Sequence, residues 1–407
     1  MIIFVSYTYI MRIGIDCRTI LHPGGEKAGI GHYTYYLVKS LLEVDKKNTY
    51  VLCFDYRIKD LSPFKRKNSE LKRLPFSRYK KFLPVLYSHL LVSSCLERAK
   101  LDVFHSPFST LPLTYKSPSV ITVHDLAIFK HPEWFPKQFL SIKVGVPKSI
   151  KKARKIIAVS WATKKDLMDI FNVPAEKIEV VYDCVDTSPI RHSKSQSFIL
   201  KKLKVKKPYI LYLGTLEPRK NLVRLIQAFK KVYTNLKSKL PDLSLVIAGK
   251  KGWKCDDIFE EVKDLRLKNR VDFTGYVSEE EKRVLYKNAQ VFAFPSLYEG
   301  FGIPVAEAMS SGLPVVTSNV SSIPEVAGKA AVLVNPKEVD EIAQALETVI
   351  KDKKFQRCLR EEGLRQAKKF GWKKCALQTL KVYKEVEKIG KKEKRKKKRK
   401  VKKSKKK

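Results

Sequence analysis

Two glutamates, eight residues apart, follow a buried apolar run and are suited to hold a polyhydroxylated ligand. In Pro295–Ser318 (PSLYEGFGIPVAEAMSSGLPVVTS), Glu299 lies in a glycine-containing loop, and Glu307 lies in the opening turns of a helix expected to begin near Pro304. Free N–H groups at such a helix end suit a diphosphate, and carboxylates suit vicinal hydroxyls because they accept hydrogen bonds. Taken alone, the pair also fits an ordinary loop with one solvated glutamate and one glutamate near the helix dipole.

A second loop places two cations after another apolar run. Tyr209–Gly214 is followed by Thr-Leu-Glu-Pro and then by Arg219 and Lys220, where a helix is expected to start. Cations at a helix start oppose the helix dipole, so an anion that neutralises them is stabilising, although the dipeptide by itself is also typical of a solvated face. Both loops follow strands of one predicted sheet and are expected to face one cleft. Together they fit a nucleotide diphosphate-sugar.

The elements that must position these loops are short apolar runs separated by helix-patterned segments. Unalternated Val, Ile and Leu runs are typical of parallel strands covered by helices on both faces. The twelve predicted strands are Arg12–Asp16, Tyr50–Phe54, Val103–His105, Val120–Val123, Ile156–Val159, Ile178–Val181, Tyr209–Gly214, Leu243–Gly249, Val271–Thr274, Val291–Pro295, Pro314–Thr317 and Ala331–Val334. We therefore expect an α/β protein with two doubly wound, Rossmann-like domains and a cleft between them.

Changes in composition mark the divisions of the chain. The expected parts are an N-terminal domain over 11–187, a linker over 188–207, a C-terminal domain over 208–370, a helix over 371–389 and a basic tail over 390–407. Met11 opens a strand-like MRIGIDCR and is expected to be the first residue translated. The apolar stripe of the helix, which includes Trp372, Leu377 and Tyr383, is expected to pack back on the N-terminal domain. The Lys-rich tail offers little to bury, so we expect it to be disordered.

The composition restricts the class of protein. Lysine and arginine number 83 against 41 acidic residues, and the resulting net charge of +42 attracts nucleic acid or an anionic membrane surface. The chain contains no recognisable base-reading module, so specific nucleic-acid binding is not expected and remains an alternative. Seven separated cysteines without a C-x-x-C motif favour a reducing cytoplasm over a disulfide framework. No apolar run is long enough to span a bilayer, so a cytoplasmic protein, at most peripheral on the inner face of the membrane, is expected.

A basic segment in the first half is suited to a second substrate, an acceptor to which the sugar of such a nucleotide diphosphate-sugar would pass. Lys65–Lys81 (KRKNSELKRLPFSRYKK) precedes the apolar FLPVLYSHLL, a combination that suits an anionic leaflet or a lipid-linked or phosphorylated acceptor. A core helix with a solvated basic end is the alternative interpretation. The tail would add a second electrostatic anchor.

Four motifs match one known family in sequence and in order. They are GTLEPRKNL over 214–222, Ala248-Gly249, FTGY over 273–276 and PSLYEGFGIPVAEAMSSGLPVVTSNVSSIPEVAG over 295–328. They resemble the retaining glycosyltransferases of family four, which have the GT-B fold, and most resemble the mannosyltransferase-type members. The resemblance extends from Met11 to about Ile389. It implies transfer of a hexose, with mannose favoured, from a nucleotide diphosphate-sugar to a glycan or lipid-linked acceptor with retention of configuration, in the synthesis of cell-envelope polysaccharide. GDP-mannose is the favoured donor, with a UDP-sugar as the alternative.

The resemblance also assigns roles to residues. In the family the two glutamates contact the donor sugar and the ribose, the first glutamate being catalytic, and the two cations hold the diphosphate. The backbone amides that would face the sugar or the phosphate are those of Gly300, Phe301 and Gly302.

The N-terminal half carries matching features and two departures. Gly31 belongs to a glycine loop that lies near the donor in the family, and His124, directly after a strand, would contact the sugar near the reacting carbon as a catalytic residue. A lone histidine in that place is otherwise usually structural, and His105 has weaker grounds for a role. Thr215 replaces an arginine found in some relatives. Tyr182–Asp186 (YDCVD) replaces a turn often written Asn-Gly-Val-Asp, which puts a donor role for that turn in doubt.

The aspartates contain no D-x-D pair, the spacing with which metal-bridged transferases hold a divalent ion on the diphosphate. We therefore expect a metal-independent site that needs no cofactor besides the donor. Fixed cations and helix N–H groups would then stabilise the leaving group. A nucleotide-sugar epimerase of the same fold is the alternative enzyme.

Overall fold

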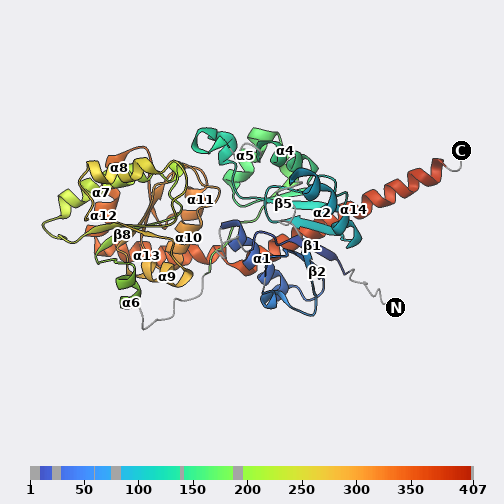
Figure 1. The fold of residues 1–407 in the computed structure, drawn as a ribbon, viewed down its shortest axis with the longest axis horizontal. Coiled ribbons are helices and arrows are strands. Elements are labelled where there is room, and N and C mark those ends of the chain that lie inside the picture. Colours follow the sequence, from blue (N-terminus) through green and yellow to red (C-terminus); the bar gives the residue numbers. More distant parts are fainter. Residues whose placement is uncertain are drawn as a thin grey trace.

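The computed structural model describes residues 10–20, 29–58, 60–74, 84–137, 142–186 and 196–404, and it describes no side chains for 84–89, 91 and 392–404. The described residues form two parallel sheets, one in each half of the chain, and helices cover both faces of each sheet (Figure 1). The predicted α/β class with two Rossmann-like domains is confirmed.

The N-terminal sheet has the order β3-β2-β1-β4-β5-β6-β7, and every pairing in it is parallel. Its strands are β1 Arg12–Asp16, β2 Thr49–Asp55, β3 Ser69–Leu74, β4 Val103–Ser106, β5 Ser119–Val123, β6 Lys155–Ala158 and β7 Ile178–Val180. The helices of this domain are α1 Gly29–Val44, α2 Pro84–Arg98, α3 Ala127–Lys130, α4 Ile142–Lys152 and α5 Trp161–Phe171. The edge strand β3 lies inside the basic segment that we associated with the acceptor, so part of that segment is sheet. Residues 75–83 of that region lie outside the described residues.

The C-terminal sheet has the order β10-β9-β8-β11-β12-β13, also entirely parallel. Its strands are β8 Tyr209–Leu213, β9 Ser244–Ala248, β10 Val271–Gly275, β11 Val291–Phe294, β12 Val315–Ser318 and β13 Val332–Val334. The helices of this half are α6 Gln196–Lys202, α7 Leu222–Leu236, α8 Asp256–Asp264, α9 Glu279–Asn288, α10 Ile303–Ser310, α11 Ile323–Ala327, α12 Val339–Lys351 and α13 Lys353–Ala367. Each of the twelve predicted strands begins and ends within one residue of its observed bounds. Part of the expected linker is the helix α6.

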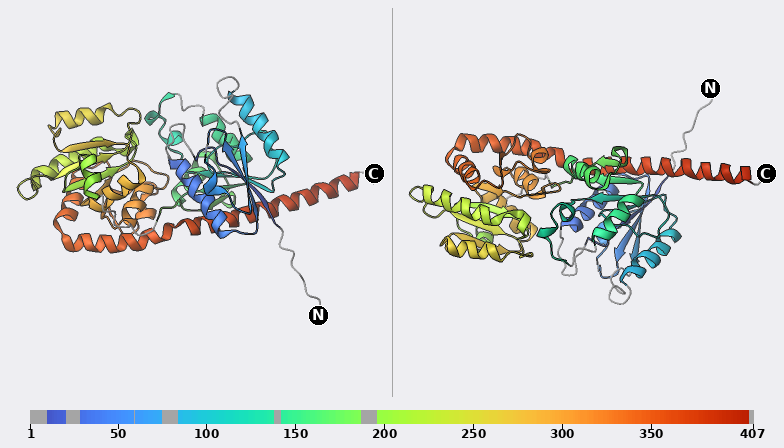
Figure 2. Two further views of the ribbon diagram at one scale, coloured as in Figure 1. Left: turned by 60° about the horizontal axis from the view of Figure 1, so that its bottom comes forward. Right: turned by 90° about the horizontal axis from the view of Figure 1, so that it is seen from above.

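The last helix, α14 (Trp372–Ser404), joins the two domains. Its buried Cys375, Leu380, Tyr383 and Val386 belong to the core formed by β1, β2 and α1 of the N-terminal domain. Leu377, which we placed in the apolar stripe, is 48% exposed. Figure 2 shows the helix running along the N-terminal domain and projecting beyond it.

The helical backbone of α14 continues through residues that we expected to be disordered. The expectation of disorder rested on the lack of apolar side chains, but Lys, Arg and Glu have good intrinsic helix propensity and can extend a helix that is already nucleated by packing.

The polypeptide crosses between the domains at two places that are bonded to each other. Val185, after β7, pairs with Gly371, just before α14, in an isolated parallel bridge, and its N–H donates to the Phe370 carbonyl at 3.0 Å. Tyr182 packs its ring against Phe370 and Phe301, so the crossing is also packed.

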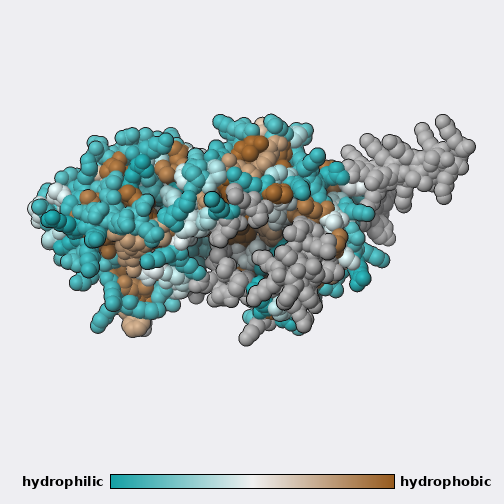
Figure 3. All heavy atoms as spheres, turned by 45° about the horizontal axis from the view of Figure 1, so that its top comes forward, coloured by the Kyte–Doolittle hydropathy of each residue, from teal (hydrophilic) through white to brown (hydrophobic). Residues whose placement is uncertain are grey.

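On the face shown in Figure 3, the described surface is mainly hydrophilic and its hydrophobic residues lie in small separate groups. Among the described residues, no helix has both the length and the apolar character that crossing a bilayer requires.

Candidate active site

A cleft of about 420 Å³ lies where the carboxyl ends of the two sheets face each other. Ligands of parallel α/β sheets bind at this edge because the strand-to-helix loops meet there. The predicted site residues that line the cleft are His124, Arg219, Lys220, Glu299, Gly300, Phe301, Gly302 and Glu307. The loops after β5, β8 and β11 supply most of them.

Glu299 is paired with both predicted cations. Its Oε1 accepts a bond from Lys220 Nζ at 2.5 Å, and its Oε2 accepts one from Arg219 Nη1 at 2.9 Å. All three side chains are largely buried. Arg219 Nε also donates to Glu217 Oε1 at 2.6 Å. The expected anion-binding cations are therefore neutralised by carboxylates, and a diphosphate that binds here must compete with Glu299 for them.

Burial and charge shift the pKa values of this group in opposite directions. Burial would raise the pKa of Glu299, but the charges of Lys220 and Arg219 outweigh it, so the pKa of the carboxyl is lowered. Burial and the neighbouring Arg219 lower the pKa of Lys220, although Glu299 opposes them. The guanidinium pKa of Arg219 is raised, because Glu299, Asp125 and Glu217 together outweigh its desolvation.

The loop that carries Glu299 is held from both sides. The Glu299 N–H donates to Ser321 Oγ at 2.9 Å, and Ser322 Oγ donates to the carbonyls of Glu299 and Phe301 at 2.9 and 3.0 Å. Asn221, the residue before α7, has its backbone in the left-handed region, and its side-chain amide donates to the Pro295 carbonyl at 2.9 Å. These bonds fix the loop relative to the basic pair.

The second predicted glutamate belongs to a charged cluster that the sequence did not reveal. Lys282 Nζ lies 2.6 Å from Glu307 Oε1 and 3.0 Å from Glu279 Oε2, and Tyr286 donates to Glu307 Oε2 at 3.1 Å. Burial alone would lower the pKa of Lys282, but the charges of Glu307 and Glu279 outweigh burial, so the pKa of Lys282 is raised. His32, Glu279 and Lys282 also line the cleft. Burial and the Lys282 charge lower the pKa of His32.

His124 is oriented by two partners in the N-terminal domain. Its Nε2 lies 3.0 Å from the Pro107 carbonyl, which can only accept, so Nε2 carries a proton. Nδ1 lies 3.7 Å from Asp183 Oδ2, and the ring meets Tyr33 edge to face at 4.8 Å. Asp183 belongs to the departing YDCVD turn, and it lines the cleft. That turn therefore reaches the site through the Asp183 side chain.

Two glycines mark close backbone approaches, and one of them differs from our expectation. A Cβ on Gly300 would lie 1.7 Å from the His124 carbonyl oxygen, so only glycine lets this loop approach the N-terminal domain so closely. Gly31 does not line the cleft. A Cβ there would lie 2.0 Å from the Thr19 carbonyl oxygen, which gives Gly31 a packing role, and its neighbours Gly29 and Ile30 line the cleft instead.

His105 is a structural histidine. It is fully buried, with Nδ1 2.6 Å from Tyr383 Oη and Nε2 2.9 Å from Thr122 Oγ1. Burial, with the nearby His124, lowers the pKa of His105 to about 3, so the imidazole is neutral in the folded protein.

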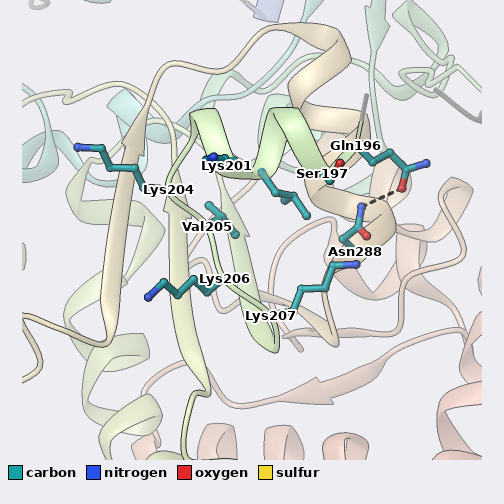
Figure 4. Close-up of a pocket in the computed structure, with 9 residues that line it drawn as sticks. Gln196, Ser197, Lys201, Lys204, Val205, Lys206, Lys207 and Asn288 are labelled. Atoms are coloured by element: carbon teal, nitrogen blue, oxygen red, sulfur yellow. Dashed lines mark hydrogen bonds between the residues drawn. The ribbon is translucent and has the colours of Figure 1, made fainter. Parts of the chain in front are cut away.

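A larger hollow, of about 810 Å³, lies beside α6 (Figure 4). Four lysines line it, and Gln196 accepts a bond from Asn288 across it at 3.3 Å. Lys206 and Lys207 are separated from β8 by Pro208 alone, so the hollow lies at the amino end of that strand. The strand-to-helix loops lie at the opposite edge, and the cleft between the domains is the better candidate site.

Comparison with known proteins agrees with this architecture. Residues 28–189 match the family described as Glycosyltransferase Family 4, and residues 195–366 match the family described as Glycosyl transferases group 1. The solved structure of Anabaena Alr3699/HepE in complex with UDP and glucose superposes with a TM-score of 0.70 over 92% of this chain and all of that one, at 20% identity. WaaG, a glycosyltransferase involved in lipopolysaccharide biosynthesis, superposes with a TM-score of 0.68 over 91% of this chain and 99% of that one, at 13% identity.

Curated relatives are closer in sequence. The O-antigen chain mannosyltransferase B of Escherichia coli is 32% identical over 92% of this chain and 100% of its own length. The O-antigen chain mannosyltransferase RfbU of Salmonella typhimurium is 32% identical over 59% of this chain and 62% of its own length. Fold, site and relatives together define a hexosyltransferase with the GT-B fold. The chain belongs to glycosyltransferase family four, as its motifs predicted.

Proposed function

We propose that the protein transfers mannose from GDP-mannose to a glycan or lipid-linked acceptor with retention of configuration, in the assembly of a cell-envelope polysaccharide. The observation that carries this proposal is the position of Glu299 and its two cations at the carboxyl end of the C-terminal sheet, opposite His124. The relatives named as O-antigen chain mannosyltransferases support the choice of sugar.

The cations and the helix end would bind the diphosphate. Arg219 and Lys220 are fixed, buried positive charges, and the amides of Gly300, Phe301 and Gly302 lie at the start of α10, where an anion is favoured. As the bond between the anomeric carbon and the phosphate oxygen breaks, these groups stabilise the negative charge of the leaving diphosphate. They are in place before the reaction, so little reorganisation is needed.

Glu299 and His124 would hold the transferred sugar from opposite domains. Once the diphosphate takes over the cations, the Glu299 carboxylate is free to accept hydrogen bonds from sugar hydroxyls. Displacement from the face that the diphosphate leaves retains the configuration: the acceptor oxygen bonds to the anomeric carbon, and its proton passes to the departing phosphate oxygen. This route requires no nucleophile from the protein.

The cluster around Glu307 would bind the nucleoside. Glu307 accepts the ribose hydroxyls, and Glu279 and Lys282, on the adjacent first turn of α9, offer an acceptor and a donor beside it. Guanine presents two adjacent N–H donors, N1–H and the 2-amino group, which one carboxylate can accept together, whereas uracil presents a single N–H donor between two carbonyls. Glu279 therefore complements GDP better than it complements UDP.

Product analysis with labelled donors tests the proposal. The purified chain would be incubated with GDP-mannose, UDP-glucose or UDP-mannose, with methyl α-mannoside as the acceptor probe, and the products would be separated and assigned by NMR. We expect an α-linked dimannoside from GDP-mannose, whereas transfer from the UDP-sugars alone, a β-linked product or an epimerised free donor would each contradict a part of the proposal.

We further propose that the basic end of α14 attaches the enzyme to an anionic membrane surface. Residues 388–407 hold fifteen basic residues and one acidic residue. Near an anionic leaflet each basic residue contributes about 1 kcal/mol. In a flotation assay the full chain should bind vesicles with 30% phosphatidylglycerol, and a chain ending at residue 389 should bind them at least tenfold less. Equal flotation of the two chains, or equal binding to neutral vesicles, would refute the attachment.

A further inference from the structure

A carboxylate of the C-terminal domain caps the N-terminus of a helix in the other domain. Glu325, in α11, accepts the Trp161 N–H on Oε2 at 2.9 Å and the Ala162 N–H on Oε1 at 3.0 Å. These are the first two N–H groups of α5, which no bond inside that helix can satisfy. The third first-turn N–H, that of Thr163, is satisfied locally by the Ser160 side chain at 2.9 Å. The cap of α5 is thus completed across the domain boundary.

A carboxylate suits this position better than any other side chain. It presents two acceptor oxygens to two adjacent donors, and its charge interacts favourably with the positive end of the helix dipole. α5 has eleven residues, so its dipole is developed. When the domains separate, these two hydrogen bonds break, and the N–H groups and the carboxylate bind water in their place. Glu325 therefore adds a specific stabilisation to the closed arrangement of the domains.

The same short segment also holds the loop of the proposed sugar-binding glutamate. Ser321 and Ser322, which lie four and three residues before Glu325, bond to the backbone of Glu299. Directly beside this contact, Thr163 Oγ1 of α5 donates to the Gly300 carbonyl at 3.2 Å. The first turn of α5 is therefore linked to Glu299 by the hydrogen bonds of Glu325, the short stretch of backbone over 321–325 and the hydrogen bonds of the two serines.

We infer that Glu325 is a positioning residue for the transfer: by completing the cap of α5, it couples closure of the domains to the placement of Glu299 in the cleft. This inference rests on the proposed function, since it assigns Glu299 to the donor sugar. The diphosphate-binding pair should keep its position when the domains separate, because the hydrogen-bond partners of Arg219 and Lys220 all lie in the C-terminal domain. These partners are Glu217, Tyr298 and Glu299. Loss of the clamp should therefore impair turnover and leave nucleotide binding intact.

Glu325→Gln is the appropriate perturbation, because it keeps the size of the side chain. The amide places an NH₂ group against one of the two backbone donors and removes the charge. Hydrogen bonds to charged groups are strong enough that losing one here should reduce the closed population, and with it kcat, about ten- to hundredfold. Glu341→Gln is the matched control, since Glu341 accepts a backbone N–H, that of Asn335, at 3.0 Å within the C-terminal domain alone.

Three measurements are made on the full-length wild type and the two variants: GDP affinity by calorimetry, GDP release from GDP-mannose with methyl α-mannoside as acceptor, and the radius of gyration by small-angle X-ray scattering. For Glu325→Gln we expect a GDP Kd within twofold of the wild type, a kcat at least tenfold lower and a larger radius of gyration. Glu341→Gln should match the wild type in all three.

A kcat within twofold of the wild type, or a lower kcat with an unchanged scattering profile, would overturn the inference. A loss of GDP affinity as large as the loss of kcat would do so too, because it would indicate general damage to the site. A wild type that neither binds GDP nor turns over GDP-mannose would refute the proposed function instead. In that case the scattering comparison alone decides whether Glu325 closes the domains.

Discussion

Replacing Glu299 by glutamine tests the idea that this carboxylate occupies the place of the donor diphosphate. The change leaves the buried Lys220 ammonium and Arg219 guanidinium without their shared counter-charge. Removing one partner of a buried ion pair typically costs about 3–5 kcal/mol, and the remaining amide oxygen can keep one bond, so about 3 kcal/mol is expected. For a domain of this size that corresponds to a fall in Tm of about 6–12 °C.

GDP should reverse much of this loss. In the wild type the diphosphate competes with Glu299 for the cations, whereas in Glu299→Gln it meets cations that have lost this carboxylate, so saturating GDP should raise the Tm of the variant more than that of the wild type. Burial lowers the pKa of Lys220, and without Glu299 it falls further. At pH values between the folded and the unfolded pKa of Lys220, the unfolded state binds more protons than the folded state, so the stability of the variant rises with pH there. The difference in Tm from the wild type should therefore become smaller as the pH rises toward the ordinary pKa of lysine.

Differential scanning fluorimetry of the wild type, Glu299→Gln and Glu341→Gln, with and without GDP, measures each of these effects. The reasoning is refuted if the ligand-free Tm of Glu299→Gln lies within 2 °C of the wild type. It is also refuted if GDP raises both melting temperatures equally.

Three further predictions concern the close approach, the buried histidine and the metal. Gly300→Ala should lower kcat at least a hundredfold while GDP affinity is retained, because a Cβ at 1.7 Å from the His124 carbonyl forces the domains apart; a kcat within fivefold of the wild type would contradict the contact. Because His105 stays neutral down to a pKa of about 3 while an unfolded histidine is protonated below about pH 6.5, the free energy of unfolding should fall by about 2 kcal/mol from pH 6.5 to pH 5. His105→Gln should remove that share of the pH dependence in urea titrations, and an unchanged dependence would refute the assignment. Turnover of GDP-mannose should be unaffected by 10 mM EDTA, and a loss that Mg²⁺ or Mn²⁺ restores would show that the expectation of metal independence is wrong.

The sheets could be predicted because parallel strands covered on both faces consist of continuous apolar runs, which stand out in a sequence. β3 has no such signal. It reads Ser-Glu-Leu-Lys-Arg-Leu, lies at an exposed edge and is fixed by its pairing with β2 and by the bidentate contact between Arg12 and Glu70. Edge strands can be polar because one side of their backbone faces solvent. The spacing of apolar residues in the sequence therefore gives little indication that such a strand is present.

The candidate site was predictable in so far as it lies on loops directly after strands. The type and place of Glu299 and the two cations followed from the sequence, but their mutual pairing did not, because it depends on how two loops 80 residues apart approach each other. Lys282 was missed although Ser278 and Glu281 form a capping box that marks the start of α9. That signal locates the helix, and only the tertiary structure shows that its first turn faces Glu307. Asp183 was missed because the turn that contains it departs from the family pattern.

The bonded crossing at Val185 and Gly371 has a mechanical consequence. The two crossing segments run side by side and are hydrogen-bonded to each other. They therefore favour rotation of one domain relative to the other about a single axis through the crossing, over translation or rotation about other axes. α14 starts at this axis and packs in the core of the N-terminal domain. A membrane surface that binds the basic end of α14 would therefore hold the N-terminal domain in place. The other domain would then be the moving part, carrying each new nucleotide-sugar toward an acceptor that stays still.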